Sequence, residues 1–162
     1  MSDKKNCIIV APHPDDELIG NFEILNNPDN KITIVYGAGT DAERRKEASK
    51  LRDVFPNVAH QVYHASFPHS YINSDTTIYV PDLVTEMHPA HRAWGFLGEQ
   101  MARDGADVVF YTVSMNVPYI HEVSDPDKKE ALLDRVYPSQ KSLWAYEKKY
   151  ILFEGRFSWH MK

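Results

Sequence analysis

The hydrophobic positions along the chain predict short buried strands that alternate with amphipathic helices. Residues 7–11 (CIIVA) form a continuous apolar run, which is typical of a strand buried on both faces of a sheet. Similar patterns predict further strands over residues 31–36, 58–63, 76–80, 106–113 and 151–157. Apolar stripes and helix boundary signals predict helices over residues 16–25, 41–55, 89–103, 127–136 and 142–150.

This alternation favours an α/β fold, a Rossmann-like three-layer sandwich with a mostly parallel sheet. The 162 residues contain no repeat or linker, so a single domain over 1–162 is expected. Thr40 lies three residues before Glu43, which is the spacing of a capping box at the start of the 41–55 helix. Residues 64–87 carry little periodicity apart from the strand at 76–80, and they predict a long loop.

Composition narrows the classes of function. Hydrophobic residues make up 43% of the chain and charged residues 25%, as is usual for a globular protein. The formal net charge of −5 gives no basic excess, so general binding to nucleic acid is not expected. Cys7, the only cysteine, lies in a predicted buried strand, where an inert thiol is expected. No apolar stretch is long enough to span a membrane, so we expect a cytoplasmic protein.

The first of the eight histidines lies in a distinctive motif, PHPDDE (residues 12–17), between the first predicted strand and helix. Open α/β sheets bind their ligands at the carboxyl ends of strands. The His13 imidazole and the Asp16 carboxylate are suitable ligands for Zn²⁺, and Asp15 would remain free to act as a base. The alternative is structural, because acidic residues at a helix start also cap backbone N–H groups. His13 favours the metal site, since a cap needs no imidazole beside it.

A second motif, HPAH (residues 88–91), lies at the start of the helix predicted over 89–103. Residues three apart lie on one helix face, so His91 could reach a metal while His88 faces the same pocket. Two imidazoles and one carboxylate leave a coordination position open for water, which is the pattern of a catalytic zinc site.

With these two motifs, the sequence resembles the zinc-dependent N-acetylglucosaminyl deacetylases of the LmbE/PIG-L type. PHPDDE after the first strand and a later HPxH carry the resemblance. Weaker matches follow in the family's order and extend it to about residue 140: Arg44, Glu47 and Ala48 in an R-x-x-E-A pattern, Arg92 after the second motif, and Lys129, Ser139 and Gln140 in a late K…SQ pattern.

The resemblance implies a site with one Zn²⁺ per chain, or Fe²⁺ in its place. The metal ligands would be His13, Asp16 and His91. Asp15 would be the general base toward a metal-bound water, and His88 would stabilise the oxyanion or protonate the leaving amine.

The resemblance also implies a substrate. Arg44, Glu47 and Arg92 would bind it, with Arg45 in place of Arg44 if the helix register differs. The implied reaction removes an acetyl group from an N-acetylated amino sugar (GlcNAc-type) or its conjugate. The chain departs from the family at Ala90, where the family has Asp, and its middle section is shorter. Two alternatives stay open: another metal-dependent amidase or phosphoesterase, and a sugar-binding module without catalysis.

Other histidines and aromatic residues have simpler interpretations. The histidines at 60, 64 and 69 are expected on the surface or in packing rather than in a second metal site, and His121 is a candidate for lining the pocket. The tryptophans at 94, 144 and 159 are expected in the core. Three tyrosines could stack on a sugar ring, namely Tyr71, Tyr119 and Tyr137.

Overall fold

The structure, a computed structural model, describes residues 4–65, 74–114 and 119–159. Its strands are β1 (Lys5–Ala11), β2 (Asn30–Gly37), β3 (Val58–His64), β4 (Thr76–Pro81), β5 (Asp107–Thr112), β6 (Ile120–Glu122) and β7 (Phe153–Ser158). Its helices are α1 (Asp16–Leu25), α2 (Ala42–Ser49), α3 (Leu51–Val54), α4 (Pro89–Arg103), α5 (Pro126–Val136), the 3₁₀ helix η2 (Pro138–Gln140), α6 (Ser142–Ala145) and α7 (Lys149–Leu152).

The strands form one mostly parallel sheet in the order β3-β2-β1-β4-β5-β7-β6. The first five strands of this order pair in parallel, whereas β7 pairs antiparallel with both β5 and β6. The chain winds outward from β1 to β3 and then crosses back to place β4 on the other side of β1. This reversal between β1 and β4 is where open α/β sheets bind ligands. The predicted α/β, Rossmann-like fold class is confirmed.

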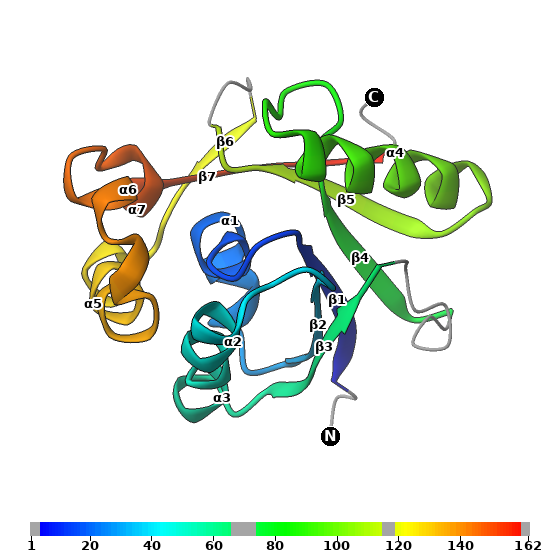
Figure 1. The fold of residues 1–162 in the computed structure, drawn as a ribbon. Coiled ribbons are helices and arrows are strands. Elements are labelled where there is room, and N and C mark those ends of the chain that lie inside the picture. The colour runs from blue at the N-terminus through cyan, green and yellow to red at the C-terminus, as the bar shows by residue number, and fades with distance from the viewer. Residues whose placement is uncertain (1–3, 66–73, 115–118, 160–162) are drawn as a thin grey trace.

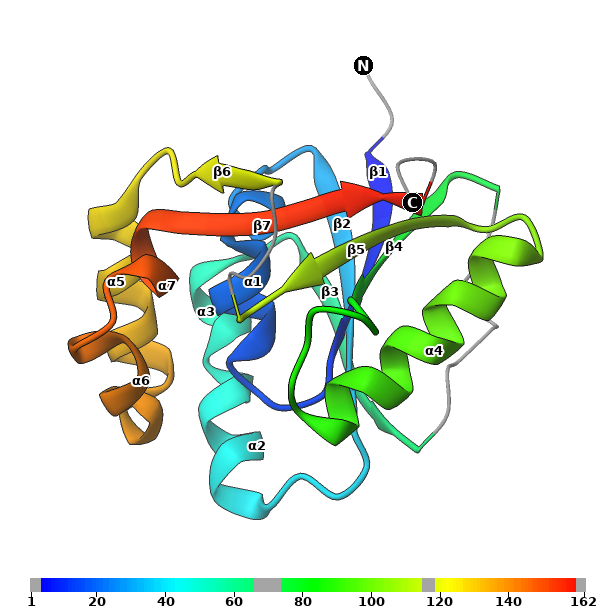
Figure 2. The same ribbon diagram turned by 90° about the horizontal axis from the view of Figure 1, so that it is seen from above.

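Helices cover both faces of the sheet (Figures 1 and 2). The helix α4 packs on one face, while α1 and the remaining helices lie on the other. Alternate residues of β1 enter different cores: Cys7 and Ile9 pack in the cluster that includes α1, whereas Ile8 and Val10 pack in the cluster that includes α4. A strand buried on both faces explains the continuous apolar run in the sequence.

Two glycines allow α4 to lie close to the sheet. A Cβ at Gly95 would come within 2.6 Å of the Pro81 carbonyl oxygen and the Leu83 nitrogen, and one at Gly98 within 2.4 Å of the Val80 side chain. Real side chains cannot occupy such positions, so these glycines set the distance between α4 and β4. The first turn of α4, which carries His91, is thereby held near the carboxyl end of β4.

Three details differ from the sequence-based predictions. The predicted helix over 41–55 is interrupted after Ser49, and its cap is Asp41, whose side chain accepts from the Arg44 N–H, rather than Thr40. The segment 142–150 forms two one-turn helices instead of one longer helix. The strand β6 was not predicted, because all three of its residues are exposed and leave no hydrophobic signal.

The interpretation of Cys7 agrees with the structure. Its side chain is buried, and burial raises the pKa of the thiol to about 11, so the thiol is protonated at neutral pH. The tryptophans also lie in or against the two cores. Within the described ranges, no helix is both long and apolar enough to cross a membrane.

A buried ion pair joins the helix that follows PHPDDE to the C-terminal part of the chain. The Lys129 ammonium is fully buried and donates to Glu154 Oε2 at 2.9 Å and to the Ile19 carbonyl oxygen at 2.6 Å. Glu154 also accepts from the Phe22 N–H at 2.7 Å. The network therefore links α1, α5 and β7, and it gives Lys129 a structural role.

Removing this ammonium should destabilise the fold. We expect Lys129→Ala to lower the free energy of unfolding by about 3 kcal/mol, because the buried Glu154 carboxylate would lose its buried partner and keep Arg156 as its remaining cation. The neighbouring exposed Lys128 is the matched control, and Lys128→Ala should change stability by less than about 0.5 kcal/mol. Urea denaturation measures both, and equal effects of the two substitutions would contradict the structural role.

Candidate metal centre

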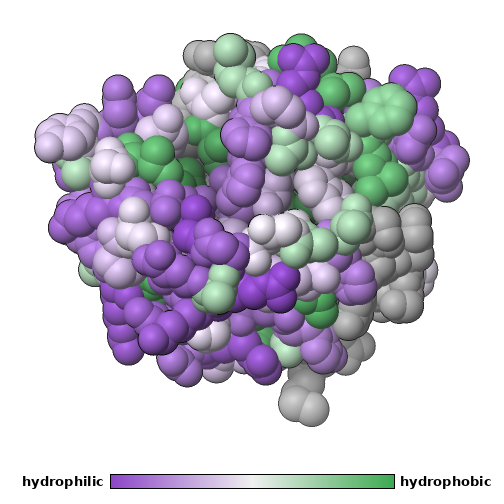
Figure 3. Space-filling view, in the orientation of Figure 1, coloured by the Kyte–Doolittle hydropathy of each residue, from purple (hydrophilic) through white to green (hydrophobic). Residues whose placement is uncertain are grey.

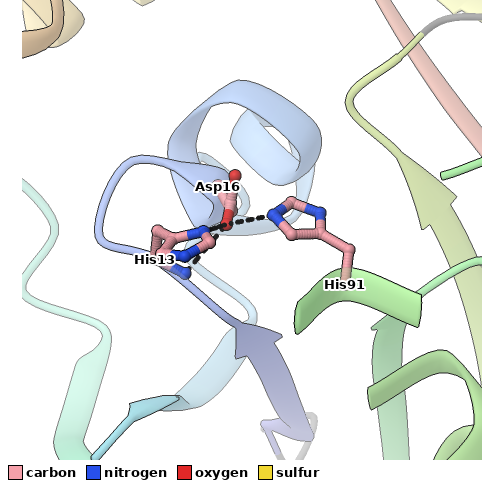
Figure 4. Close-up of side chains that lie close together, drawn as sticks. All are labelled: His13, Asp16 and His91. Carbon is pink, nitrogen blue, oxygen red and sulfur yellow. Dashed lines mark hydrogen bonds and ion pairs between the residues drawn. The ribbon is translucent and has the colours of Figure 1, made fainter. Parts of the chain in front are cut away.

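The two histidine motifs meet at the carboxyl ends of β1 and β4. His13, Asp15 and Asp16 follow β1 directly, while His88 and His91 come from the start of α4, after β4. Because β1 and β4 are paired neighbours, residues that are far apart in the sequence share one edge of the sheet. Figure 4 shows His13, Asp16 and His91 pointing toward one another from the loop after β1, the start of α1 and the start of α4.

The Asp16 carboxylate lies between the two imidazoles. Its Oδ2 is 3.1 Å from His91 Nε2 and 3.6 Å from His13 Nδ1, and it accepts from the His13 N–H at 2.9 Å. One ligand atom from each of the three residues lies within 4.8 Å of the others, so this group could hold a metal ion. Two nitrogens and one carboxylate oxygen form a donor set that suits a divalent transition metal. The proposed ligands therefore fit a metal by both type and position.

Asp16 and His91 hold each other in charged forms. Burial opposes the ionisation of Asp16, but His91 and the hydrogen bond to His13 hold its pKa well below the usual range. Burial also opposes the protonation of His91, but Asp16 and Glu86 outweigh it and raise the pKa of His91 to about 10. A metal bound here would take the place of the His91 proton as the positive partner of Asp16.

Asp15 does not act as a helix cap. It precedes α1, yet its side chain makes no capping hydrogen bond within the described structure. Its backbone has φ of 122°, a region that residues other than glycine rarely adopt and that costs about 1–3 kcal/mol. Asp15 is 4% exposed and lies 3.3 Å from the Arg44 guanidinium. Burial and the Asp16 charge raise the pKa of Asp15, while Arg44 opposes this shift.

Glu17 supports the strained turn from inside the protein. Its Oε2 accepts from the Asp15 N–H at 3.2 Å, and its Oε1 accepts from the Tyr137 hydroxyl. The side chains of Glu17 and Tyr137 are both fully buried. Tyr137 is therefore occupied in the core and does not offer a face to a sugar, contrary to the stacking considered from the sequence.

His88 caps α4 with its ring. The Nδ1 atom accepts from the Ala90 N–H at 3.1 Å, so this nitrogen carries no proton and the hydrogen of the neutral ring lies on Nε2. The His88 ring lies 4.7 Å from the His13 ring and 5.4 Å from the His91 ring, measured between centroids. Desolvation and the neighbouring His13 lower the pKa of His88, which favours the same neutral form.

Glu86 is a site residue that the sequence reasoning missed. It is 2% exposed, its Oε1 accepts from the Val113 N–H at 2.6 Å, and its Oε2 lies 3.7 Å from His91 Nδ1. His91 Nδ1 is buried and has no hydrogen-bond partner among the described residues. A carboxylate behind a metal-binding imidazole orients the ring and strengthens it as a ligand. The only signal in the sequence is an acidic residue two positions before HPAH.

The metal group opens into a pocket with a volume of about 510 Å³. Its lining combines the charged cluster with apolar side chains from several elements. The lining residues are His13, Asp15, Asp16, Ile19, Arg44, Glu86, Met87, His88, His91, Val113, Ser114, Gln140, Leu143 and Tyr150.

The structure separates the two candidate arginines of α2. Arg44 reaches the Pro14 carbonyl oxygen and Asp15 and lines the pocket. Arg45 lies over the Tyr63 ring at 4.1 Å and donates to the Thr40 and Ala38 carbonyl oxygens. The Asp41 cap fixes this register, so Arg44 is the arginine at the site.

The other candidate substrate residues lie outside the pocket lining. Glu47 accepts from both the N–H and the hydroxyl of Ser139, and this contact joins α2 to η2. Arg92 is exposed on α4 and does not line the pocket, and neither does His121 on β6. Tyr119 packs near Phe157, while Tyr71 and His69 lie outside the described residues.

A comparison with models of known protein families finds no match, and a comparison with curated protein sequences finds none either.

Metal binding should separate the two histidines of HPAH. With Zn²⁺ as the probe, His91→Ala should weaken binding by about 100-fold or more, because it removes a ligand. The matched control, His88→Asn, keeps a side chain that caps α4 and should change affinity by less than about threefold. Titration against a chelating dye measures both affinities. Equal losses, or none for His91→Ala, would contradict the ligand assignment.

Glu86 should matter for metal affinity without being a ligand. We expect Glu86→Gln to weaken Zn²⁺ binding by about 10–100-fold, because the amide cannot match the carboxylate as an acceptor for the His91 ring. Glu99→Gln, on the same side of the sheet but away from the pocket, is the control. An unchanged Zn²⁺ affinity in Glu86→Gln would show that Glu86 does not support His91.

Proposed function

We propose that this protein is a zinc-dependent hydrolase that removes an acetyl group from an N-acetylated amino sugar or its conjugate. The observation that carries the proposal is the metal-binding group His13, Asp16 and His91 beside the buried, non-capping carboxylate of Asp15. When bound, Zn²⁺ would polarise the amide carbonyl and lower the pKa of a water molecule to about 7. The same donor set also suits Fe²⁺.

Asp15 is the group that would move protons. Its carboxylate lines the pocket next to the metal ligands and is held at a strained backbone position by Arg44 and Glu17. A raised pKa suits a carboxylate that takes a proton from water and returns it to the leaving amine. Strain is retained at positions where the surrounding structure fixes a reactive geometry.

His88 would act as a hydrogen-bond donor rather than as an acid. Its Nδ1 is engaged by the Ala90 N–H, so a second proton on the ring would break the cap of α4. The Nε2–H of the neutral ring would stabilise negative charge on the amide oxygen. Ala90 is therefore compatible with catalysis. The hydrogen bond from the Ala90 N–H already fixes the tautomer of His88, so no carboxylate side chain at position 90 is needed for that purpose. Asp15 would then supply both proton transfers.

The strain at Asp15 argues against a module that only binds sugar. Binding alone gains nothing from a buried carboxylate held at φ of 122° beside a metal group, whereas a proton-transfer residue requires a fixed position. The second candidate from the sequence, a phosphoesterase, would need cations for the phosphate. Arg44, the cation in the described lining, is already paired with Asp15.

Asp15→Asn should separate metal binding from catalysis. We expect the variant to bind Zn²⁺ with unchanged stoichiometry and to release acetate from N-acetylglucosamine conjugates about 10²–10⁴-fold more slowly. Asp127→Asn, at an exposed position of α5, is the control and should keep the full rate. A full rate in Asp15→Asn would overturn the base assignment. A zinc-loaded native protein that releases no acetate would overturn the proposed function.

A further inference from the structure

The charges of the pocket balance once a divalent ion is present. The carboxylates in the described lining are Asp15, Asp16 and Glu86, and the cation is Arg44. A divalent ion and Arg44 together supply three positive charges. These offset the three carboxylates when all are ionised, which is the form in which Asp15 can act as a base. The internal segments 66–73 and 115–118 contain no Lys or Arg in the sequence. The described pocket therefore offers no surplus positive charge to a phosphate or carboxylate group on a substrate.

The remaining wall of the pocket is apolar. Met87 lies on the loop before α4 and is 82% exposed, while Leu143 lies on α6 and is 43% exposed. Val113 and Ile19 add to the same lining. Large apolar side chains that are exposed around a cavity mark a binding surface. Figure 3 shows hydrophobic residues among polar ones in the upper half of the view, whereas hydrophilic residues predominate over α2 and α3.

Few uncharged polar side chains are available to recognise hydroxyl groups. Apart from the histidines of the two motifs, the described lining offers Ser114, Gln140 and the Tyr150 hydroxyl. The Ser114 hydroxyl is already bonded to Thr112 and to the Thr85 carbonyl oxygen. A bare sugar with many hydroxyls would leave the apolar wall uncovered. An apolar group on the substrate would cover it and gain free energy from burial.

We infer that the pocket selects an uncharged amide that carries an apolar substituent next to the scissile bond, in preference to a phosphorylated or otherwise anionic substrate. The inference deepens the proposed function and rests on the same site. Met87 and Leu143 are the residues that determine this specificity. Each methylene that becomes buried against them should increase affinity by about fourfold, until the apolar wall is covered.

Binding of defined probes tests the inference. Calorimetry on the zinc-loaded Asp15→Asn variant compares methyl, butyl and hexyl glycosides of N-acetylglucosamine with N-acetyl, N-butyryl and N-hexanoyl glucosamine. N-acetylglucosamine 6-phosphate is compared with the unphosphorylated sugar on the zinc-loaded native protein, which keeps all three carboxylates. At least one of the two chain series should gain about fourfold per methylene, and the 6-phosphate should bind more weakly than the unphosphorylated sugar. Two flat series, or a 6-phosphate that binds as tightly, would overturn the inference.

Two leucines with the same exposure provide a matched pair of variants. Leu143 lines the pocket, whereas Leu152, on α7, is also 43% exposed but lies outside the lining. Leu143→Asn should weaken binding of the best hexyl or hexanoyl probe by about tenfold and leave the shortest probe within about twofold. Leu152→Asn should change neither, and equal effects of both substitutions would refute the apolar wall.

The outcomes distinguish the inference from the proposed function. If the Asp15→Asn variant binds longer chains more tightly but the native zinc-loaded protein releases no acetate, the inferred specificity stands and the proposed deacetylase activity is rejected. Acetate release with no dependence on chain length would keep the deacetylase and reject the specificity.

Discussion

The Asp16 carboxylate lies 3.1 Å from the His91 imidazole, and this contact joins two parts of the chain that meet because of the sheet topology. Asp16 follows β1 and His91 follows β4, and the crossover that places β4 beside β1 brings both to one edge. Gly95 and Gly98 allow α4 to approach β4 closely enough to complete the contact. The candidate metal centre therefore depends on strand order and helix packing as well as on its own ligands.

Three side chains beside the metal group also form hydrogen bonds that stabilise the surrounding fold. His88 caps α4, Glu86 accepts from the end of β5, and Arg44 bonds to the loop after β1. Each of these side chains is thereby held by the scaffold before any substrate arrives. Fixed donors and acceptors of this kind contribute to catalysis because they need little reorganisation during the reaction. The tautomer of His88 is one consequence, since the helix cap decides which nitrogen carries the proton.

Much of the fold could be predicted from the sequence, because its central strands are continuous apolar runs and its helices carry distinct stripes. The metal group could be predicted for a related reason: its three residues lie in two short motifs, each directly after a strand. The register of α2 could not be settled, because Asp41 and Thr40 are both good caps and only the structure chooses between them. That choice decides whether Arg44 or Arg45 faces Asp15.

Residues whose roles depend on distant partners gave no usable signal. The Val113 N–H holds the Glu86 carboxylate at the site. Ser139, which lies far along the chain, binds the Glu47 carboxylate outside the pocket lining. Leu143 and Tyr150 reach the pocket from the C-terminal helices, where the sequence predicted one long helix instead of two short ones. Long-range packing, which local patterns do not encode, places all of these side chains.

Anomalous diffraction from a crystal of the zinc-soaked protein tests the central claim most directly. We predict one strong peak at the zinc edge, about 2.0–2.2 Å from a nitrogen of His13, an Asp16 oxygen and His91 Nε2. Asp15 and His88 should face the same ion without binding it. A zinc-loaded crystal whose peak lies away from these three residues, or that shows no peak between β1 and α4, would contradict the metal centre and the function proposed from it.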